Sequence, residues 1–156
     1  IIPVATNAFH SPWGIAFNEA QRMALEADVT WQENSPRAGV EGMKAARAMG
    51  MISFRTYNTF LHTQSEKTSD KTDNFRAASY QRYQGQKLAN RFNAFSYWVL
   101  TKVMDSHHVG RGRVSTEDAL QKIKARTWVM GIDSDLLFPL EEQKFLARHI
   151  PGAQLD

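Results

Sequence analysis

Hydrophobic and polar positions along most of the chain recur with the period of amphipathic helices. Ser11 and Pro12 are typical of a helix start, and the apolar residues that follow fall on one face at helical spacing. These residues are Trp13, Ala16, Phe17, Ala20, Met23, Ala24 and Ala27. Further helices are predicted over about 38–54, 73–91 and 94–105. Residues 62–71 are almost wholly polar, and we predict a mobile loop there.

The two ends of the chain follow a different pattern. Residues 1–6 (Ile-Ile-Pro-Val-Ala-Thr) predict a strand, which we expect to belong to the interior of a longer protein sequence. Near the other end, a Ser-x-x-Asp capping pattern predicts a helix over 115–124. A short apolar run, Trp128 to Ile132, then predicts a buried parallel strand, and Pro139 precedes a last helix. A helical block of about a hundred residues inserted in an α/β core fits this order.

Two acids follow the predicted buried strand, Asp133 and Asp135. A carboxylate just beyond the end of a parallel strand lies at the edge of the sheet where active sites collect. Asp135 is therefore the first candidate for a catalytic residue. The alternative is that such an acid caps the helix that follows or forms a turn.

Arg47 is the most informative residue of the helical block. Its predicted helix has an apolar stripe of Val40, Met43, Met51 and Phe54, and Arg47 lies on that stripe. A charged side chain on a buried face must reach solvent, form an ion pair or bind an anion. Arg47 is therefore either part of a structural ion pair or a binding group for an anion such as a carboxylate.

Composition narrows the class of protein. Hydrophobic residues make up 42% and charged residues 22% of the 156 residues, which is ordinary for one globular domain. The net charge is only +3, and the basic residues are scattered among acidic ones, so we expect no nucleic-acid partner. No apolar run is long enough to span a membrane. Cysteine is absent, which excludes disulfides and thiolate chemistry and fits the cytoplasmic location that we expect.

Several other residues are interpreted as structural. His107 and His108 are adjacent, and without a third ligand at metal spacing they predict no metal site. Glu19 and Arg22 are predicted to form an ordinary surface pair on a polar helix face. Four aromatic residues at helical spacing are expected to pack within the helical block or form a dimer contact: Tyr80, Tyr83, Tyr97 and Trp98.

Three segments together carry a family resemblance. Gly131-Ile-Asp-Ser-Asp-Leu-Leu-Phe-Pro139 resembles the acid-bearing loop of the homoserine O-acetyltransferase family, a branch of the α/β-hydrolase superfamily. Ser79-Tyr-Gln-Arg-Tyr-Gln-Gly-Gln-Lys-Leu-Ala-Asn-Arg-Phe92 is similar to the family signature S-Y-L-x-Y-Q-G-x-K-x-x-x-R-F. The segment from His10 to Arg22 resembles the first helix of the family's lid. The match covers nearly the whole chain in register.

The resemblance implies an α/β fold, namely an α/β-hydrolase core fragment with a mainly helical lid insertion. It divides the chain into a core strand (1–6), a helical lid (7–114) and a return to the core that carries the acid loop (115–156). It further implies acetyl transfer from acetyl-CoA to homoserine in methionine biosynthesis. Asp135 would be the triad aspartate, and Arg47 would bind the homoserine carboxylate. No cofactor is implied beyond acetyl-CoA as co-substrate, and lid helices would form a homodimer.

The chain also departs from the family pattern. None of its ten serines lies in a G-x-S-x-G elbow, and the only histidine after Asp135 is His149, within a predicted helix. We therefore expect an internal piece of a longer enzyme, inactive alone. Phe54 stands where the family commonly has tyrosine, and Asn93 where it has aspartate; both are interpreted as helix-junction caps.

Several alternatives remain open on the sequence. The donor could be succinyl-CoA in place of acetyl-CoA, or the acceptor could be serine in place of homoserine. The chain could also be part of an ester hydrolase of the same superfamily, or a non-catalytic helical interaction module.

Overall fold

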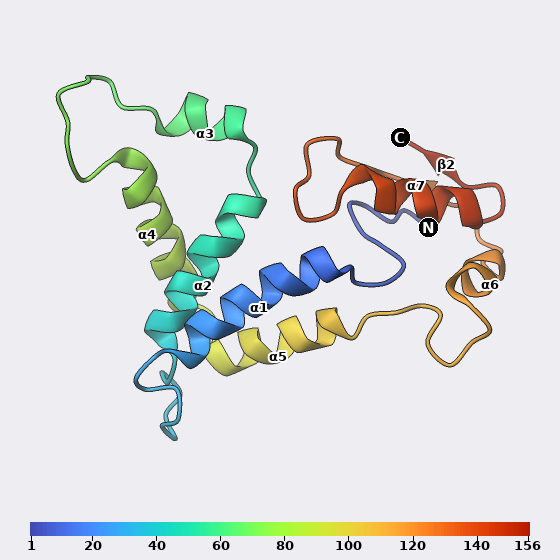
Figure 1. Ribbon diagram of the computed structural model, residues 1–156, viewed down its shortest axis with the longest axis horizontal. Coiled ribbons are helices and arrows are strands. Elements are labelled where there is room, and N and C mark those ends of the chain that lie inside the picture. The colour runs from blue at the N-terminus through green and yellow to red at the C-terminus, as the bar shows by residue number, and fades with distance from the viewer. The chain divides into compact units, whose positions relative to one another are not determined.

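The structure is a computed structural model that describes all 156 residues. Its elements, in chain order, are α1 (Pro12–Glu26), α2 (Val40–Ser53), α3 (Tyr57–Gln64), α4 (Arg76–Ala89), α5 (Ala94–Asp105), α6 (Thr116–Gln121), β1 (Trp128–Val129), α7 (Leu140–His149) and β2 (Gln154–Leu155) (Figure 1). They form two compact units. Residues 1–15 and 103–156 make up the strand unit, and residues 16–102 make up the helical unit.

A small parallel sheet organises the strand unit. β1 pairs with β2 in parallel, with Trp128 opposite Gln154 and Val129 opposite Leu155. On the other side of β1, Val4 forms a parallel bridge with Met130. The Met130 amide donates to Pro3 O at 2.9 Å, and the Ala5 amide donates to Met130 O at 2.9 Å. The predicted strands at 1–6 and 128–132 are therefore both present as short extended segments in the same sheet. The prediction that the second is buried holds only for Val129, since Trp128, Met130 and Ile132 are 37–46% exposed.

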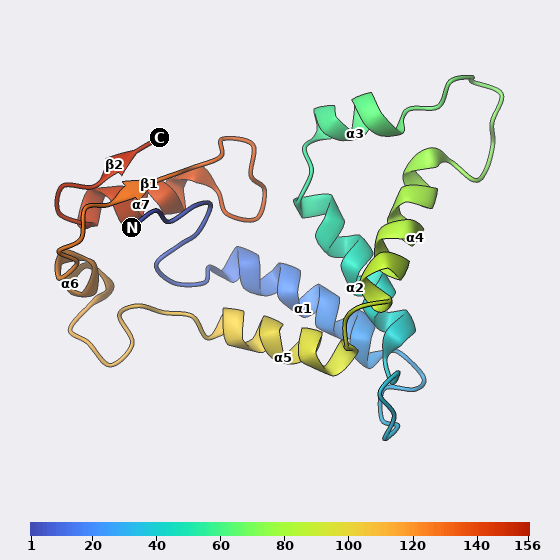
Figure 2. The same ribbon diagram turned by 180° about the vertical axis from the view of Figure 1, so that it is seen from behind.

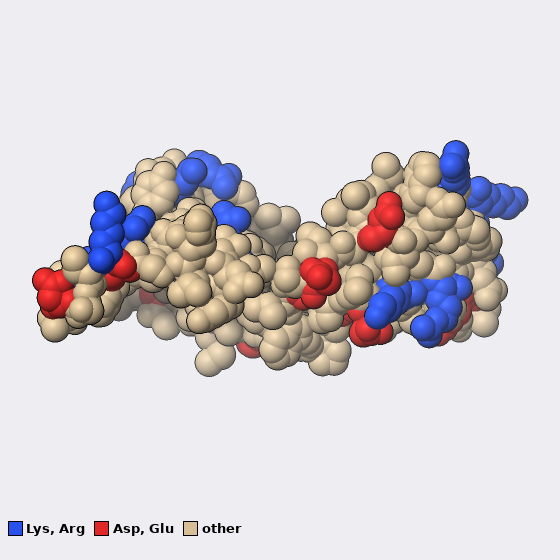
Figure 3. All heavy atoms as spheres, turned by 90° about the horizontal axis from the view of Figure 1, so that it is seen from above, with Lys and Arg blue, Asp and Glu red and all other residues tan.

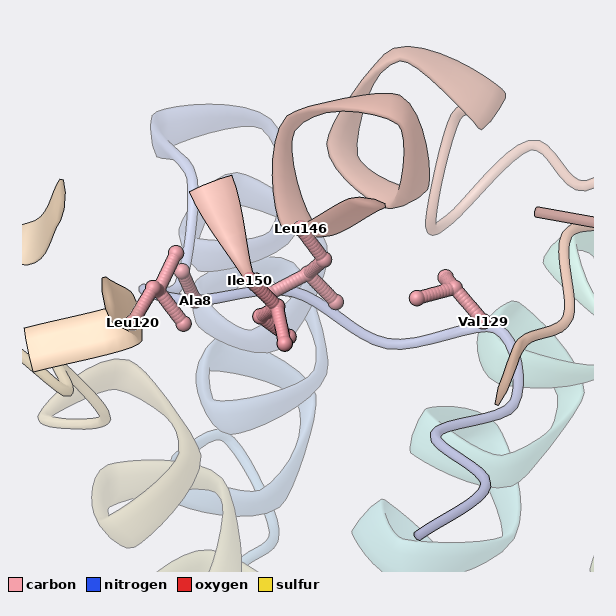
Figure 4. Packing of buried hydrophobic residues seen from close by; sticks show 5 residues of the cluster. All are labelled: Ala8, Leu120, Val129, Leu146 and Ile150. Atoms are coloured by element: carbon pink, nitrogen blue, oxygen red, sulfur yellow. The ribbon is translucent and has the colours of Figure 1, made fainter. Parts of the chain in front are cut away.

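The core of the strand unit lies between this sheet and its helices. It consists of Ala8, Leu120, Val129, Leu146 and Ile150 (Figure 4). α7 connects β1 to β2, and its buried residues Gln143 and Leu146 lie about one turn apart, on one helix face. Gln143 is fully buried, and its side-chain amide donates to Thr6 O at 2.9 Å. This bond ties the first extended segment to α7.

The helical unit is built on close helix contacts. Its core consists of Leu25, Met43, Ala46, Leu88 and Ala94. α2 packs against α4, and α1 lies beside α5 in both views (Figures 1 and 2). Glycines permit the closest approaches: a Cβ at Gly42 would lie 2.4 Å from Ala24 O, and one at Gly85 would lie 2.8 Å from Lys44 O. A side chain at either position would force the helices apart.

The predicted packing face of α1 is not the buried one. Trp13 and Met23 are 53% and 64% exposed, whereas the buried α1 side chains include Asn18, Gln21, Arg22 and Leu25. The apolar stripe of α1 therefore faces largely outward. Polar side chains can occupy the buried face because they find hydrogen-bond partners there. Hydrophobic periodicity located the helix correctly and its buried face incorrectly.

The Glu19–Arg22 pair forms as predicted, but its burial differs from the prediction. The Arg22 Nε donates to Glu19 Oε2 at 2.8 Å, so the pair exists. Arg22 is however only 2% exposed, and the prediction of an ordinary surface pair is therefore wrong. The spacing of the two residues predicted the contact correctly, but it contained no information on burial.

Most predicted helix boundaries agree with the structure to within about three residues. The capping predictions are confirmed: Ser115 Oγ accepts from the Asp118 amide at 3.0 Å, and Asn93 Oδ1 accepts from the Ser96 amide at 3.0 Å. The predicted loop at 62–71 is wrong in its first three residues, which belong to α3. α3 was missed because it has no buried residue, and Thr56 marks its start by capping the Thr59 amide at 3.1 Å.

No helix is long and apolar enough to cross a membrane. On the face drawn in Figure 3, basic side chains are scattered and interleaved with acidic ones. The division into a core strand (1–6), a lid (7–114) and a returning core segment (115–156) stays a prediction.

Candidate active site

The structure places Asp135 in the loop between β1 and α7, just past the end of a parallel strand. Its backbone amide donates to Ile132 O at 3.1 Å. Its side-chain Oδ1 accepts from the amides of Leu137 and Phe138 at 2.8 and 2.9 Å. The second oxygen, Oδ2, accepts no hydrogen bond from the described residues. The carboxylate is thus held by its own loop through one oxygen, and the other oxygen remains available to a further donor.

Side chains from the start of the chain pack on this loop. The Trp13 indole Nε1 donates to Leu136 O at 2.6 Å. The buried His10 ring lies 6.1 Å from the Phe138 ring, centroid to centroid. Both anchors come from within or next to the first turn of α1, so the loop conformation depends on residues more than a hundred positions away. No sequence pattern indicated this contact, because Trp13 fitted an apolar helix stripe equally well.

The turn interpretation of Asp135 and the catalytic one are compatible. The two amide bonds to Oδ1 are those of a turn, as the alternative required. In a Ser-His-Asp triad, the aspartate uses a carboxylate oxygen to accept a bond from the histidine N–H. A carboxylate pre-oriented through Oδ1 and open at Oδ2 meets that geometric requirement. Asp133, the other acid of the loop, is exposed and accepts no hydrogen bond from the described residues.

Arg47 lies on α2 in the helical unit and is half-buried. Its guanidinium carbon lies 5.3 Å from the centroid of the Phe54 ring, over the ring face. The described residues offer the guanidinium no hydrogen bond and no ion pair, so the alternative of a structural ion pair is not realised. Met43 and Met51 on the same helix are buried, as the stripe predicted, whereas Phe54 at the end of the stripe is 49% exposed. Arg47 is therefore a partly buried cation whose donors are unoccupied.

Tyr97 lies close enough to Arg47 to interact with its charge, and the sequence pattern assigned it no specific role there. Burial raises the pKa of the Tyr97 phenol above its ordinary value, and the positive charge of Arg47 opposes that rise. The hydroxyl of Tyr97 donates to Gln21 Oε1. Its position beside Arg47 depends on α1, α2 and α5 together, and no local motif encodes it.

The remaining candidates have structural contacts. His107 Nε2 lies 3.2 Å from Asn7 O. The His108 ring stacks on Phe9 at 5.4 Å, and its Nδ1 accepts from the Gly110 amide at 3.1 Å. No group of three histidine, aspartate or glutamate side chains is arranged to hold a metal ion. Phe54 follows the last residue of α2, at the junction with α3, as predicted.

Comparison with known proteins decides the family. No family model matches the chain. A homoserine O-acetyltransferase from Cyclobacterium marinum is 55% identical over 150 residues, which cover 96% of this chain and 42% of that protein. By sequence, the chain belongs to the homoserine O-acetyltransferase family. It spans less than half the length of the curated relatives it matches.

Solved structures place the fold in the same superfamily. The crystal structure of homoserine O-acetyltransferase from Staphylococcus aureus matches 99% of this chain and 42% of that chain, with a TM-score of 0.75 and 25% identity. An acetylester hydrolase from Corynebacterium glutamicum matches 99% of this chain and 44% of that chain, with a TM-score of 0.81 and 19% identity. The predicted α/β-hydrolase fold with a helical insertion is confirmed. The roles of Asp135 and Arg47 stay predictions.

Proposed function

We propose that the protein to which this chain belongs transfers an acetyl group from acetyl-CoA to the hydroxyl of L-homoserine. The observation that carries the proposal is the 55% identity to a homoserine O-acetyltransferase over nearly the whole chain. The geometry of the Asp135 loop supports it, because a carboxylate fixed through one oxygen suits the acid of a catalytic triad.

The reaction proceeds in two acyl transfers. A serine hydroxyl outside the 156 residues attacks the thioester carbon, and a histidine, also outside them, takes the serine proton and delivers it to the departing CoA thiolate. The homoserine hydroxyl then attacks the acetyl-serine ester, and its proton returns through the same histidine to the serine. Asp135 orients the histidine and stabilises its charged form in both steps. No cofactor is needed, since acetyl-CoA is itself a substrate.

Arg47 binds the carboxylate of homoserine in this proposal. Its planar guanidinium offers two parallel donors to a planar carboxylate, and no group of the chain occupies those donors. Phe54 packs against the cation without a hydroxyl of its own. No acidic side chain of the chain pairs with Arg47, so the substrate carboxylate would be its ionic partner.

The proposed assembly is a homodimer formed through lid helices. Both α1 and α5 expose apolar side chains: Met23 is 64% exposed, Phe95 62% and Leu100 51%. Burial of such side chains favours association by about 25 cal/mol per Å² of apolar surface. Light scattering on the full-length protein measures the mass directly, and a monomer at micromolar concentration contradicts the dimer.

The triad role is tested by Asp135→Asn in the full-length protein. Asparagine retains an oxygen for the Leu137 and Phe138 amides, so the loop should keep its shape. Turnover should fall by about 10⁴-fold, because the amide neither holds the correct histidine tautomer nor stabilises its cation. Asp133→Asn in the same loop serves as the matched control and should turn over normally. Near-normal turnover of Asp135→Asn removes Asp135 from the triad.

The substrate role is tested by Arg47→Ala. The KM for homoserine should rise about 10- to 100-fold, since two charge-assisted hydrogen bonds are lost, while the KM for acetyl-CoA stays close to normal. Arg82→Ala removes an arginine from α4 and should change neither constant. An unchanged homoserine KM in Arg47→Ala rejects the assigned role.

Ester hydrolysis is a second candidate, because the chain also has the fold of an acetylester hydrolase. The two activities differ in whether homoserine or water accepts the acyl group. A transferase should form O-acetylhomoserine faster than free acetate when homoserine is present. Parallel assays with succinyl-CoA as donor and with serine as acceptor distinguish the remaining members of the class.

A further inference from the structure

The face of α2 that carries Arg47 has an opening one turn further along, at Gly50. A Cβ at Gly50 would lie 3.1 Å from Gln21 Oε1 and 3.7 Å from the Tyr97 hydroxyl. Gly50 is three residues from Arg47, so the two positions are neighbours on the helix surface. The absence of a side chain at Gly50 therefore lets groups from α1 and α5 approach α2 beside the arginine.

Those groups form a short hydrogen-bonded chain. The Tyr97 hydroxyl donates to Gln21 Oε1, and Gln21 Nε2 donates to Phe17 O at 3.0 Å. Gln21 is 7% exposed, which leaves its side chain little freedom to move. The phenol hydrogen is thus used in the bond to Gln21, and the phenol oxygen keeps its lone pairs to accept from another donor. A fixed dipole results, with a defined orientation beside α2.

The phenol is also electrostatically coupled to the guanidinium. Burial raises the pKa of Tyr97, so the phenol remains neutral although the Arg47 cation favours its ionised form. Phe54 lies across one face of the guanidinium and supplies no hydroxyl. The neutral Tyr97 hydroxyl is therefore a dipole on a neighbouring helix, at the side of α2 that Gly50 leaves open.

We propose that Tyr97 is a positioning residue for Arg47: held by Gln21 in the space left by Gly50, its hydroxyl dipole orients the guanidinium for an incoming carboxylate. The inference rests on the proposed binding of the homoserine carboxylate by Arg47. Tyr97 need not touch the substrate, because its effect is transmitted through Arg47.

Tyr97→Phe in the full-length protein tests the inference. The ring and its packing remain, and only the hydroxyl is lost. The KM for homoserine should rise roughly three- to tenfold, as for the loss of one hydrogen-bonding group, with kcat and the KM for acetyl-CoA within twofold. Tyr83→Phe, which removes the hydroxyl of an exposed α4 tyrosine, is the matched control and should leave all three constants unchanged. An unchanged homoserine KM in Tyr97→Phe overturns the inference.

A double-mutant cycle separates positioning from a structural role. If Tyr97 acts through Arg47, Tyr97→Phe should add no further increase in homoserine KM once Arg47→Ala is present. Additive effects of the two substitutions overturn the inference and leave the carboxylate role of Arg47 intact. If Arg47→Ala itself leaves the homoserine KM unchanged, the proposed carboxylate site fails, and the inference fails with it.

Discussion

The crossing of α1 and α2 at Gly42 allows a quantitative prediction. An alanine Cβ at this position would lie 2.4 Å from Ala24 O and 2.8 Å from Leu25 Cα. Non-bonded heavy atoms are most stable at about 3.5 Å or more, so the helices must separate by roughly 1 Å. Both atoms belong to the α1 backbone, which cannot rotate away as a side chain can.

The expected cost combines two opposing effects. Overpacking a core contact costs about 1–3 kcal/mol, and a rigid backbone partner favours the upper end. Replacing glycine by alanine inside a helix contributes about 1 kcal/mol in the opposite direction. Gly42→Ala should therefore reduce the free energy of unfolding by about 2 kcal/mol.

Urea unfolding of the full-length protein, followed by tryptophan fluorescence, measures this change. Trp31 and Trp98 pack against the core cluster of the helical unit and report on it. Gly50→Ala is the matched control on the same helix, because its Cβ would meet only side-chain ends at 3.1 Å or more. We expect a smaller loss of stability than for Gly42→Ala, because the Gln21 side chain has to yield by only a few tenths of an ångström and no backbone atom is in the way. A Gly42→Ala protein as stable as the parent would refute the close backbone contact.

Two further substitutions test each unit separately. Burial alone would raise the pKa of Asp28, but hydrogen bonds that its carboxylate accepts, from the Gly42 amide at 2.8 Å and from Thr30, outweigh burial and lower it. Asp28→Asn should therefore reduce the free energy of unfolding by about 1–3 kcal/mol at neutral pH. Urea unfolding midpoints of the parent and the variant, measured over a series of pH values, should converge as the pH falls below about 4 and through the lowered pKa of Asp28, because the parent carboxylate is then protonated. A pH-independent difference would contradict this. In the strand unit, Leu146→Ala should cost about 2–5 kcal/mol by thermal or urea unfolding, against less than about 0.5 kcal/mol for the half-exposed Leu136→Ala.

The sequence predicted the α/β class and most elements because their signals are local. Ser115 precedes its helix with the spacing of a capping box, and Asn93 lies at a helix junction; both cap as expected. The apolar run at Trp128 predicted a parallel strand, and the structure pairs it on both sides. α3 was missed because it buries nothing, and no hydrophobic period marks it.

Tertiary structure decided which faces are buried and which groups meet. The apolar stripe of α1 is largely exposed, while Gln21 and Arg22 are buried, where Gln21 accepts a hydrogen bond from Tyr97 and Arg22 donates to Glu19. Periodicity reports the spacing of apolar residues and contains no information about partners on other helices. The sequence could identify Asp135 and Arg47 as candidates by residue type and position, but it could not identify the residues that contact them. The bond from Trp13 to the acid loop and the place of Tyr97 beside Arg47 join residues far apart in the chain, and only the folded chain brings them together.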